Sequence, residues 1–223
     1  MQAGPEPAAE NSEAGGGIID VMRCKSLVLS AAVVGAGSLP GPAGAEPACY
    51  ELDPAHTTVA FLVEHAGFAK TLGRFLDVRG RYTFDAEASA LSDVRVVVDT
   101  ASVNTAHEER DRHLRSDDFL DSRSHREMTF TAQGAERTGE RTFAVTGELE
   151  LLGMRRPLTL EATLNKHAPY PFGDRAEVMG VSARGTLKRS DFDMTYGVAD
   201  SLVGDEVEII IELEARRGCS ERR

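Results

Sequence analysis

The fold is decided by residues 142–164, TFAVTGELELLGMRRPLTLEATL. Apolar side chains alternate with polar ones on both sides of a short turn, with Leu149 and Leu151 before it and Leu158 and Leu160 after it. Alternation with a period of two residues is typical of a strand with one buried face. Two such runs joined by a tight turn pair as antiparallel neighbours. The stretch therefore predicts an antiparallel sheet in which each strand presents one apolar face.

The same alternation recurs along most of the chain after Thr57. It predicts eight strands, at about residues 59–65, 70–84, 94–99, 128–132, 142–151, 158–164, 181–188 and 206–214. In the second strand, Gly73 and Gly80 are the expected bend points. Strands of this kind, mostly linked by short turns, indicate an all-β antiparallel barrel or sandwich.

The interior of such a barrel decides what the protein can do. Eight strands enclose a space that side chains can fill or that can hold one small ligand. The inward residues are large and apolar at many positions. Small inward residues favour leftover space; they are Ala132, Gly147, Ala162, Ala183 and Gly185. The pattern alone leaves both interpretations open.

One stretch interrupts the alternation, residues 99–130, DTASVNTAHEERDRHLRSDDFLDSRSHREMTF. It contains the one helix that we predict for the folded domain, with Thr105 and Glu108 at the spacing of a capping box. The helix is polar on almost every face, so it cannot nucleate a core. We expect one short helical insert, closed by Phe119 and Leu120, at the edge or mouth of the β structure.

The first 45 residues have the character of a leader. Residues 1–21 are acidic and rich in glycine, whereas Met22 opens a basic patch followed by the apolar run 27–39 and a small-residue triplet at 43–45. This is the order of a secretory signal peptide, and the apolar run is short for a membrane span. We expect Met22 to be the true start, residues 1–21 to be an over-extended gene start, and 46–223 to be the exported domain, periplasmic or secreted. The alternative is an uncleaved anchor.

The net charge indicates which partners are excluded, and the cysteines indicate a disulfide. A formal net charge of −11 argues against a nucleic-acid partner and against anionic membrane surfaces. Cys49 and Cys219 lie at the two ends of the domain. In an exported protein such cysteines are usually oxidised. If an even number of antiparallel strands closes on itself, the first and last strands are neighbours, and a Cys49–Cys219 disulfide can tie them. The alternative is two unrelated free thiols.

The residues that carry chemistry do not form a known catalytic motif. The six histidines lack the His-Glu-x-x-His spacing of a metal site, and no Gly-x-Ser-x-Gly elbow is present. We therefore expect no metal and no cofactor. Arg110, Asp111 and His113 are expected to form a polar cluster at the barrel mouth, which His56 and His65 join only if the fold brings them there. This cluster keeps a lipid-directed or metal-assisted enzyme as the alternative function.

Four groups of residues carry a resemblance that spans nearly all of 49–214. They are Tyr50–Thr57 with Phe61, Val63, His65, Gly67 and Gly73–Phe75; Arg110–Leu114 with Asp118–Asp121 and Met128–Phe130; Gly147–Leu158; and Leu187–Phe192 with Met194 and Val203–Val207. In this order the chain resembles the YceI-like family of periplasmic polyisoprenoid-binding proteins.

The resemblance implies a lipocalin-like, eight-stranded antiparallel barrel whose hollow interior holds a long isoprenoid or a similar amphiphilic lipid. It implies a binding protein for carriage or storage, not an enzyme. A third interpretation is an interaction module with a packed interior. A homodimer and a membrane donor or acceptor protein remain open as partners. We predict that the ligand contacts Phe61, Val63, Phe75, Val96, Phe119, Phe130, Phe143, Leu149, Leu151, Leu160 and Met194, with His65, Arg110 and His113 at its polar end.

Two positions depart from the family pattern. His125-Arg126 stands where an aromatic-proline pair is usual, and Asp193 stands where glycine is usual. We expect the charge of Asp193 to narrow or re-polarise one end of the pocket.

Overall fold

The structure is a computed structural model that describes residues 46–220. The expected signal peptide and the expected start at Met22 lie outside the described residues. The described residues lie within one compact unit. Its apolar core is complete within it, from Tyr50 to Ala215. The described residues therefore form a domain with its own core.

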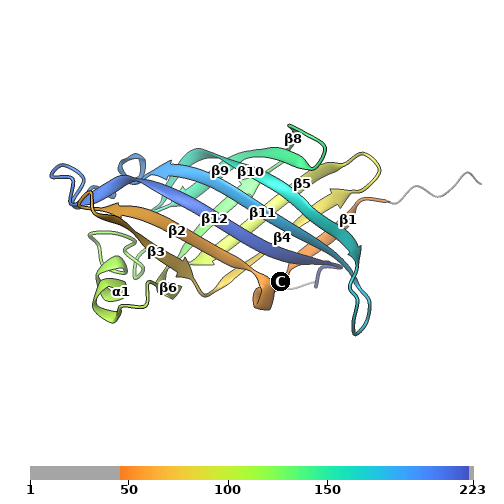
Figure 1. The fold of residues 1–223 in the computed structure, drawn as a ribbon, viewed down its shortest axis with the longest axis horizontal. Coiled ribbons are helices and arrows are strands. Elements are labelled where there is room, and N and C mark those ends of the chain that lie inside the picture. The colour runs from red at the N-terminus through yellow and green to blue at the C-terminus, as the bar shows by residue number, and fades with distance from the viewer. Residues whose placement is uncertain (1–45, 221–223) are drawn as a thin grey trace, which may run out of the picture. The chain divides into compact units, whose positions relative to one another are not determined.

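The domain is one antiparallel sheet rolled into a barrel (Figure 1). Its strands are β1 (Ala48–Leu52), β2 (Thr58–His65), β3 (Ala69–Phe75), β4 (Val78–Asp85), β5 (Ala90–Asp99), β6 (Val103–Asn104), β7 (Glu127–Ala132), β8 (Glu136–Arg137), β9 (Thr142–Leu151), β10 (Met154–Pro169), β11 (Glu177–Lys188) and β12 (Val203–Arg217). Its helices are η1 (Pro54–His56), η2 (Thr100–Ser102), α1 (Glu108–Leu114) and η3 (Arg189–Phe192).

Eight strands form the closed ring, in the order β1, β4, β5, β7, β9, β10, β11 and β12. The pairing of β1 with β12 closes it. The remaining pieces extend these strands: β2 continues β1, β3 leads into β4, and β6 continues β5, while β8 pairs with β9. The predicted eight-stranded antiparallel barrel with one short α-helix is confirmed.

Three neighbouring strands are broken at the same level of the barrel wall. The breaks are η1 between β1 and β2, Leu76–Asp77 between β3 and β4, and η2 between β5 and β6. The backbone N–H groups of Leu76 and Asp77 both donate to Ser102 Oγ, each at 3.1 Å, which joins two of the breaks. The breaks change which side chains face inward: Phe75 lines the interior from β3, and Tyr82 lines it from β4, although their positions have opposite parity.

The strand is broken at Leu76–Asp77, and not at the predicted bend points Gly73 and Gly80, which both lie inside strands. Gly73 serves packing instead. It faces Phe61 across the β2–β3 pair, and a Cβ atom at this position would stand 2.2 Å from Phe61 Cζ. The missing side chain leaves room for the Phe61 ring.

The helical insert lies at the edge of the barrel, as predicted, beside β3 and β6 (Figure 1). The predicted capping box was wrong. His107 caps α1, and its Nδ1 accepts from the backbone N–H of Arg110 at 3.3 Å. Thr105 is buried, and both its N–H and its hydroxyl donate to the buried carboxylate of Asp111, at 2.7 and 2.5 Å. Within residues 46–220, no helix has the length and apolar character needed to cross a membrane.

The two ends of the domain are joined. Cys49 and Cys219 form a disulfide with a Cα–Cα distance of 5.7 Å. The bond lies beside the short β1–β12 contact, which pairs Tyr50 with Arg217 and Leu52 with Ala215. The disulfide predicted from barrel closure is confirmed, and the interpretation as two free thiols was wrong.

Candidate ligand-binding site

The barrel encloses a cavity of about 510 Å³ that is lined almost entirely by apolar side chains. The lining reaches from His65 and Leu202, at the end that carries α1, to Ser89 and Ala135, at the opposite end. A volume of this size is within the range of pockets that bind small organic ligands. The interior is therefore hollow, and the interpretation as a fully packed barrel was wrong.

Every side chain predicted to contact a ligand lies along this cavity. From the strands these are Phe61, Val63, His65, Phe75, Val96, Phe130, Phe143, Leu149, Leu151 and Leu160, and from the helical insert and the β11–β12 connection they are Arg110, His113, Phe119 and Met194. The alternation of the strands identified the first group because inward positions recur every second residue. Their contact with a ligand stays a prediction.

Other lining residues were not predicted. Tyr82, Phe84 and Met179 form part of the lining away from α1, and Tyr196 and Leu202 contribute at the end near α1. Tyr82 and Phe84 were missed because the break at Leu76–Asp77 resets the alternation within what looked like one strand. Tyr196 and Leu202 lie in an irregular connection, where no periodic signal exists.

The polar groups of the lining gather near α1. Arg110 Nε donates to Thr105 Oγ1 at 2.7 Å, and its Nη2 donates to the Thr105 carbonyl at 2.9 Å. His113 Nε2 pairs with Asp118 at 2.9 Å. The His113 ring meets the edges of Phe119 and Tyr196, with centroid distances of 5.0 and 4.9 Å. These contacts hold a cation and an imidazole at the mouth of an otherwise apolar cavity.

Arg189 adds a buried cation to the same end, although it is only 3% exposed. Its guanidinium donates to four carbonyl oxygens, those of Met194, Tyr196, Val203 and Gly204, at 2.8 to 3.2 Å. It also lies 5.6 Å from the centroid of the Phe119 ring. Burial lowers the pKa of Arg189, while the charge of Asp205 acts in the opposite direction. Arg189 thus fixes the β11–β12 connection against the mouth.

Aromatic side chains line the end of the cavity away from α1. Tyr82 donates its hydroxyl to Met179 Sδ at 3.7 Å, and burial raises the pKa of Tyr82. Tyr50 stacks on Tyr82 with a centroid distance of 5.7 Å. The Tyr50 hydroxyl is 2.9 Å from His167 Nε2, which also pairs with Glu177. The polar atoms here are engaged with one another, so this end presents mainly apolar surface to the cavity.

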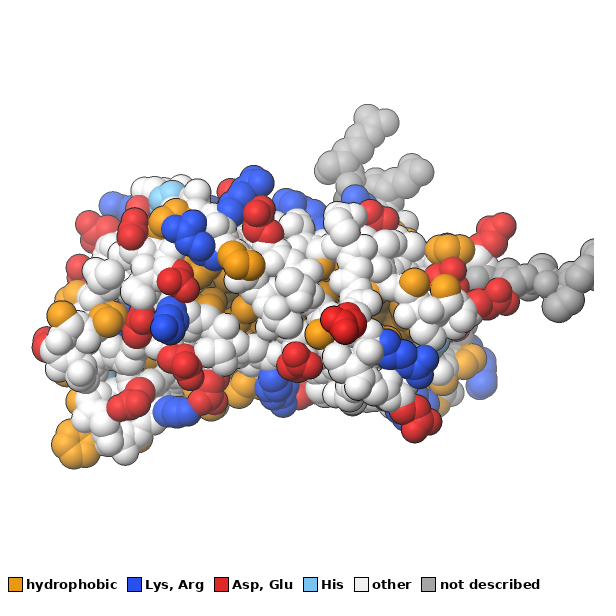
Figure 2. Space-filling view, turned by 90° about the horizontal axis from the view of Figure 1, so that it is seen from above, with side chains coloured by type: hydrophobic (Ala, Val, Ile, Leu, Met, Phe, Trp, Pro, Cys, Tyr) orange, Lys and Arg blue, Asp and Glu red, His pale blue; other side chains and the backbone are white. Residues whose placement is uncertain are grey.

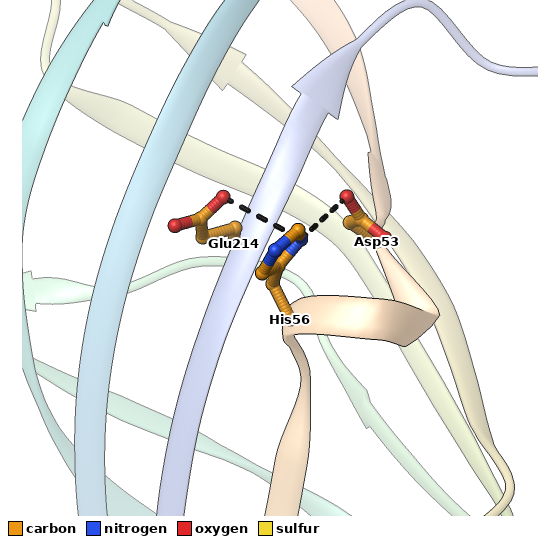
Figure 3. Close-up of side chains that lie close together, drawn as sticks. All are labelled: Asp53, His56 and Glu214. Atoms are coloured by element: carbon orange, nitrogen blue, oxygen red, sulfur yellow. Dashed lines mark hydrogen bonds and ion pairs between the residues drawn. The ribbon is translucent and has the colours of Figure 1, made fainter. Parts of the chain in front are cut away.

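His56 is separated from the other residues that were proposed for a catalytic cluster. His113 pairs with Asp118, and Asp111 is held by Thr105. His56 instead lies with Asp53 and Glu214 (Figure 3), where its Nδ1 is 2.9 Å from Asp53 Oδ2 and 3.9 Å from Glu214 Oε2. The predicted polar cluster at the mouth therefore includes Arg110 and His113 but does not include His56.

Asp53, His56 and Glu214 have the donor types of a metal site, and sequence reasoning missed the group. The hydrogen bond that the Asp53 carboxylate accepts from His56 raises the pKa of His56, and the same bond lowers the pKa of Asp53. A metal ion here would compete with the His56–Asp53 hydrogen bond, and it would approach the positive charge of Arg216. The three side chains form an ion-paired group that joins η1 to β12.

Comparison with known proteins identifies the chain at the level of a family. Residues 50–215 match the sequence model of the YceI-like domain. The chain belongs to the YceI-like family. It is 36% identical over 190 residues to a UPF0312 protein of Ectopseudomonas mendocina, which covers 85% of this chain and 97% of that protein. It is also 36% identical over 159 residues to Protein YceI of Escherichia coli O17:K52:H18, covering 71% and 81%.

Solved structures share the YceI-like barrel. The Campylobacter jejuni YceI protein aligns with a TM-score of 0.63 and 30% identity, covering 70% of this chain and 90% of that one. Burkholderia cenocepacia BcnA has a TM-score of 0.64 and 21% identity over 73% and 98% of the two chains. A domain from Saccharophagus degradans, described as polyisoprenoid-binding, has a TM-score of 0.56 and 18% identity over 76% and 98%. The last two likenesses show the fold.

One departure from the YceI-like pattern has a local explanation. Asp193 follows η3 with φ of +56°, in the left-handed region where glycine is favoured. Aspartate is among the residues that tolerate this conformation best. The Asp193 side chain is exposed and is not part of the cavity lining. The expectation that its charge re-polarises the pocket was wrong, because the position is a helix cap.

Proposed function

We propose that this YceI-like protein binds a long isoprenoid or a similar amphiphilic lipid in its barrel, for carriage or storage outside the cytoplasm. The observation that carries the proposal is the long apolar cavity of about 510 Å³ with its polar groups gathered near α1. The description of the Saccharophagus degradans domain as polyisoprenoid-binding supports the same ligand class. The leader-like sequence before residue 46 and the Cys49–Cys219 disulfide support an oxidising compartment.

The apolar lining supplies the affinity in this proposal. Removing apolar surface from water is favourable by about 25 cal/mol per Å². An isoprenoid chain offers little except such surface, and the lining offers few polar atoms to compete for it. His65, Arg110 and His113 would orient the lipid by hydrogen bonds to a carbonyl or a phosphate near α1. Binding of this kind needs no nucleophile and no cofactor.

The direct experiment is mass spectrometry of organic extracts from the protein, purified from the periplasm without detergent. We expect an isoprenoid, quinone or fatty amphiphile in a stoichiometric amount. An empty protein that also takes up no added isoprenoid would contradict the proposal. A His113→Ala variant separates the two functional classes: we expect weaker lipid binding, whereas conversion of a bound lipid that stops in this variant would indicate an enzyme.

Leu151→Trp tests the role of the cavity itself. Leu151 is buried and lines the interior, so a larger ring should occupy space that the lipid needs. We expect a folded protein whose uptake of retinol, a fluorescent isoprenoid, falls at least about tenfold, the equivalent of about 1.4 kcal/mol. In a packed interior the same change would cost about 1–3 kcal/mol of stability.

Leu72→Trp is the matched control, since Leu72 is exposed on β3 and is not part of the cavity lining. It should leave retinol uptake unchanged. Equal uptake by Leu151→Trp and the unmodified protein would show that the lipid does not enter the barrel.

A further inference from the structure

Three exposed apolar side chains lie at the end of the barrel that carries α1. Phe68, in the β2–β3 turn, is 92% exposed, and Tyr196 and Leu202, in the β11–β12 connection, are each 42% exposed. We refer to Phe68, Tyr196 and Leu202 as the rim cluster. The two segments are in contact, because the Ala66 N–H donates to the Leu202 carbonyl at 3.0 Å. The rim cluster therefore belongs to one edge of the barrel.

The rim cluster is continuous with the cavity. Tyr196 and Leu202 are part of the cavity lining as well as partly exposed. Tyr196 also packs on Phe119 of the helical insert, with a centroid distance of 5.2 Å. Apolar surface thus runs from the outside of the rim into the interior. A lipid chain that moved along this path would remain against apolar side chains.

The fold itself gives no reason for an aromatic residue at position 68. The turn is tight, with positive φ at Ala66 and Gly67 and a hydrogen bond from the Phe68 N–H to the His65 carbonyl. The Phe68 ring projects into solvent and contributes nothing to the core. Figure 2 shows hydrophobic side chains at the tip of the barrel end that carries α1 in Figure 1. Single exposed apolar residues are common, so the position of Phe68 at the cavity mouth is what distinguishes it.

Three basic side chains near the rim cluster are paired with acidic ones. Lys70 pairs with Glu208, Arg112 with Glu109, and His113 with Asp118. The chain as a whole is acidic, with a net charge of −11. Attraction to anionic lipid headgroups requires excess basic residues, which this rim does not offer. The apolar side chains are therefore suited to a neutral or zwitterionic surface.

We propose that the rim cluster docks on a lipid bilayer, with Phe68 inserted among the lipids and the cavity mouth facing the membrane. This inference rests on the proposed function, since it names the source of the lipid. Aromatic and aliphatic side chains that enter the headgroup region are the usual anchors of proteins that lie on a membrane. In this orientation the cavity mouth opens directly onto the bilayer, in which the lipid ligand is dissolved.

The test is flotation of the protein, residues 46–223, with phosphatidylcholine vesicles. We expect the unmodified protein to float with the vesicles and Phe68→Ser to lower its partition coefficient about tenfold or more. Phe172→Ser is the matched control, because Phe172 is 73% exposed in the β10–β11 turn, away from the cavity lining. It should float like the unmodified protein. Added salt should not release the protein, because the attachment is apolar.

Retinol uptake in vesicle-free solution separates the two proposals. Phe68 is not part of the cavity lining, so Phe68→Ser should bind retinol normally. Retinol uptake without flotation of the unmodified protein would overturn docking and leave the proposed function standing. Equal loss of flotation in Phe172→Ser would also overturn docking at this rim. A change of oligomeric state in Phe68→Ser, without a change in partition, would identify a second copy of the chain as the occupant and overturn the membrane proposal.

Discussion

His56 connects two segments that are far apart in the sequence. It lies in η1, bonds Asp53 in the same turn, and faces Glu214 near the end of β12. The pKa of His56 is raised and that of Asp53 is lowered, in each case first by the hydrogen bond between them. A histidine whose pKa is raised by folding makes its full contribution to stability at pH values below its ordinary pKa of about 6.5. This contribution is lost as the pH rises through the folded-state pKa.

His56→Gln should therefore lower stability in a pH-dependent way. The contribution of Asp53 is present above about pH 4 and is lost as the pH falls through its lowered value. The variant should differ most from the unmodified protein at about pH 5.5 and least at about pH 9. Urea unfolding at the two pH values measures this difference. In an Asp53→Asn background the pH dependence should largely disappear; its persistence would show that another group is responsible.

Individual lining residues were predicted where the period of two holds without interruption. Leu149 and Leu151 on β9 are examples, since β9 is continuous from Thr142 to Leu151. The role of Tyr82 was not predictable in this way. It depends on the break at Leu76–Asp77, which is fixed by Ser102, a residue 25 positions from Asp77. Contacts between distant residues of this kind leave no periodic trace in the sequence.

At the scale of elements, the helical insert forms part of the cavity wall. Arg115 follows α1 and donates to two backbone carbonyls, those of Ala101 and Val103, each at 2.8 Å. These bonds join the end of α1 to η2 and β6. On the other side of the mouth the insert meets Tyr196 through the rings of His113 and Phe119. Arg115 thus anchors the carboxyl end of α1, as the Thr105–Asp111 hydrogen bonds anchor its amino end.

Arg115→Met should loosen this element locally. Hydrogen bonds that involve a charged group contribute about 1.5–3 kcal/mol each. We expect amide hydrogen exchange in residues 107–122 to accelerate at least about tenfold, which corresponds to about 1.4 kcal/mol, while exchange in β9 and β10 stays slow. Arg112→Met is the control on the same helix, because Arg112 forms an exposed pair with Glu109, and such pairs contribute about 0–1 kcal/mol. Similar acceleration in both variants would contradict the role of Arg115.

The elements themselves were largely predictable, and their boundaries were less so. The alternation predicted the strands, and the loss of alternation predicted the insert. The cap of α1 was not predicted, because Thr105 fits a capping box by spacing but is drawn inward by Asp111. A buried carboxylate needs hydrogen-bond donors, and Thr105 satisfies this need instead of capping the helix. The local sequence pattern assigned Thr105 to the helix cap, whereas the buried Asp111 carboxylate requires Thr105 as a hydrogen-bond donor.

At the scale of the whole molecule, barrel closure rests on a small contact. The β1–β12 register consists of the pairs Tyr50–Arg217, Glu51–Arg216 and Leu52–Ala215. The Cys49–Cys219 disulfide reinforces this contact across a sequence separation of 170 residues. Cross-linking the ends of a long loop restricts the unfolded chain, which is the usual account of disulfide stabilisation.

Replacing both Cys49 and Cys219 with serine should lower the free energy of unfolding by about 2–5 kcal/mol. Chemical denaturation of residues 46–223 under non-reducing conditions measures the loss. The unmodified protein in dithiothreitol should match the double variant, since both lack the bond. An unchanged free energy of unfolding in both would show that strand pairing alone is sufficient for closure.

The closing strand also sets when the cavity comes into existence. Ribosomes deliver a chain from its amino end, yet β1 finds its second neighbour only in β12, the last strand of the described residues. Until residues 203–217 have arrived, the earlier strands can form only a curved open sheet with two unpaired edges and an uncovered apolar face. Such edges invite aggregation. A chain that ends before β12 therefore lacks the closed cavity and presents an aggregation-prone open sheet, so the cavity forms only after β12 has been synthesised.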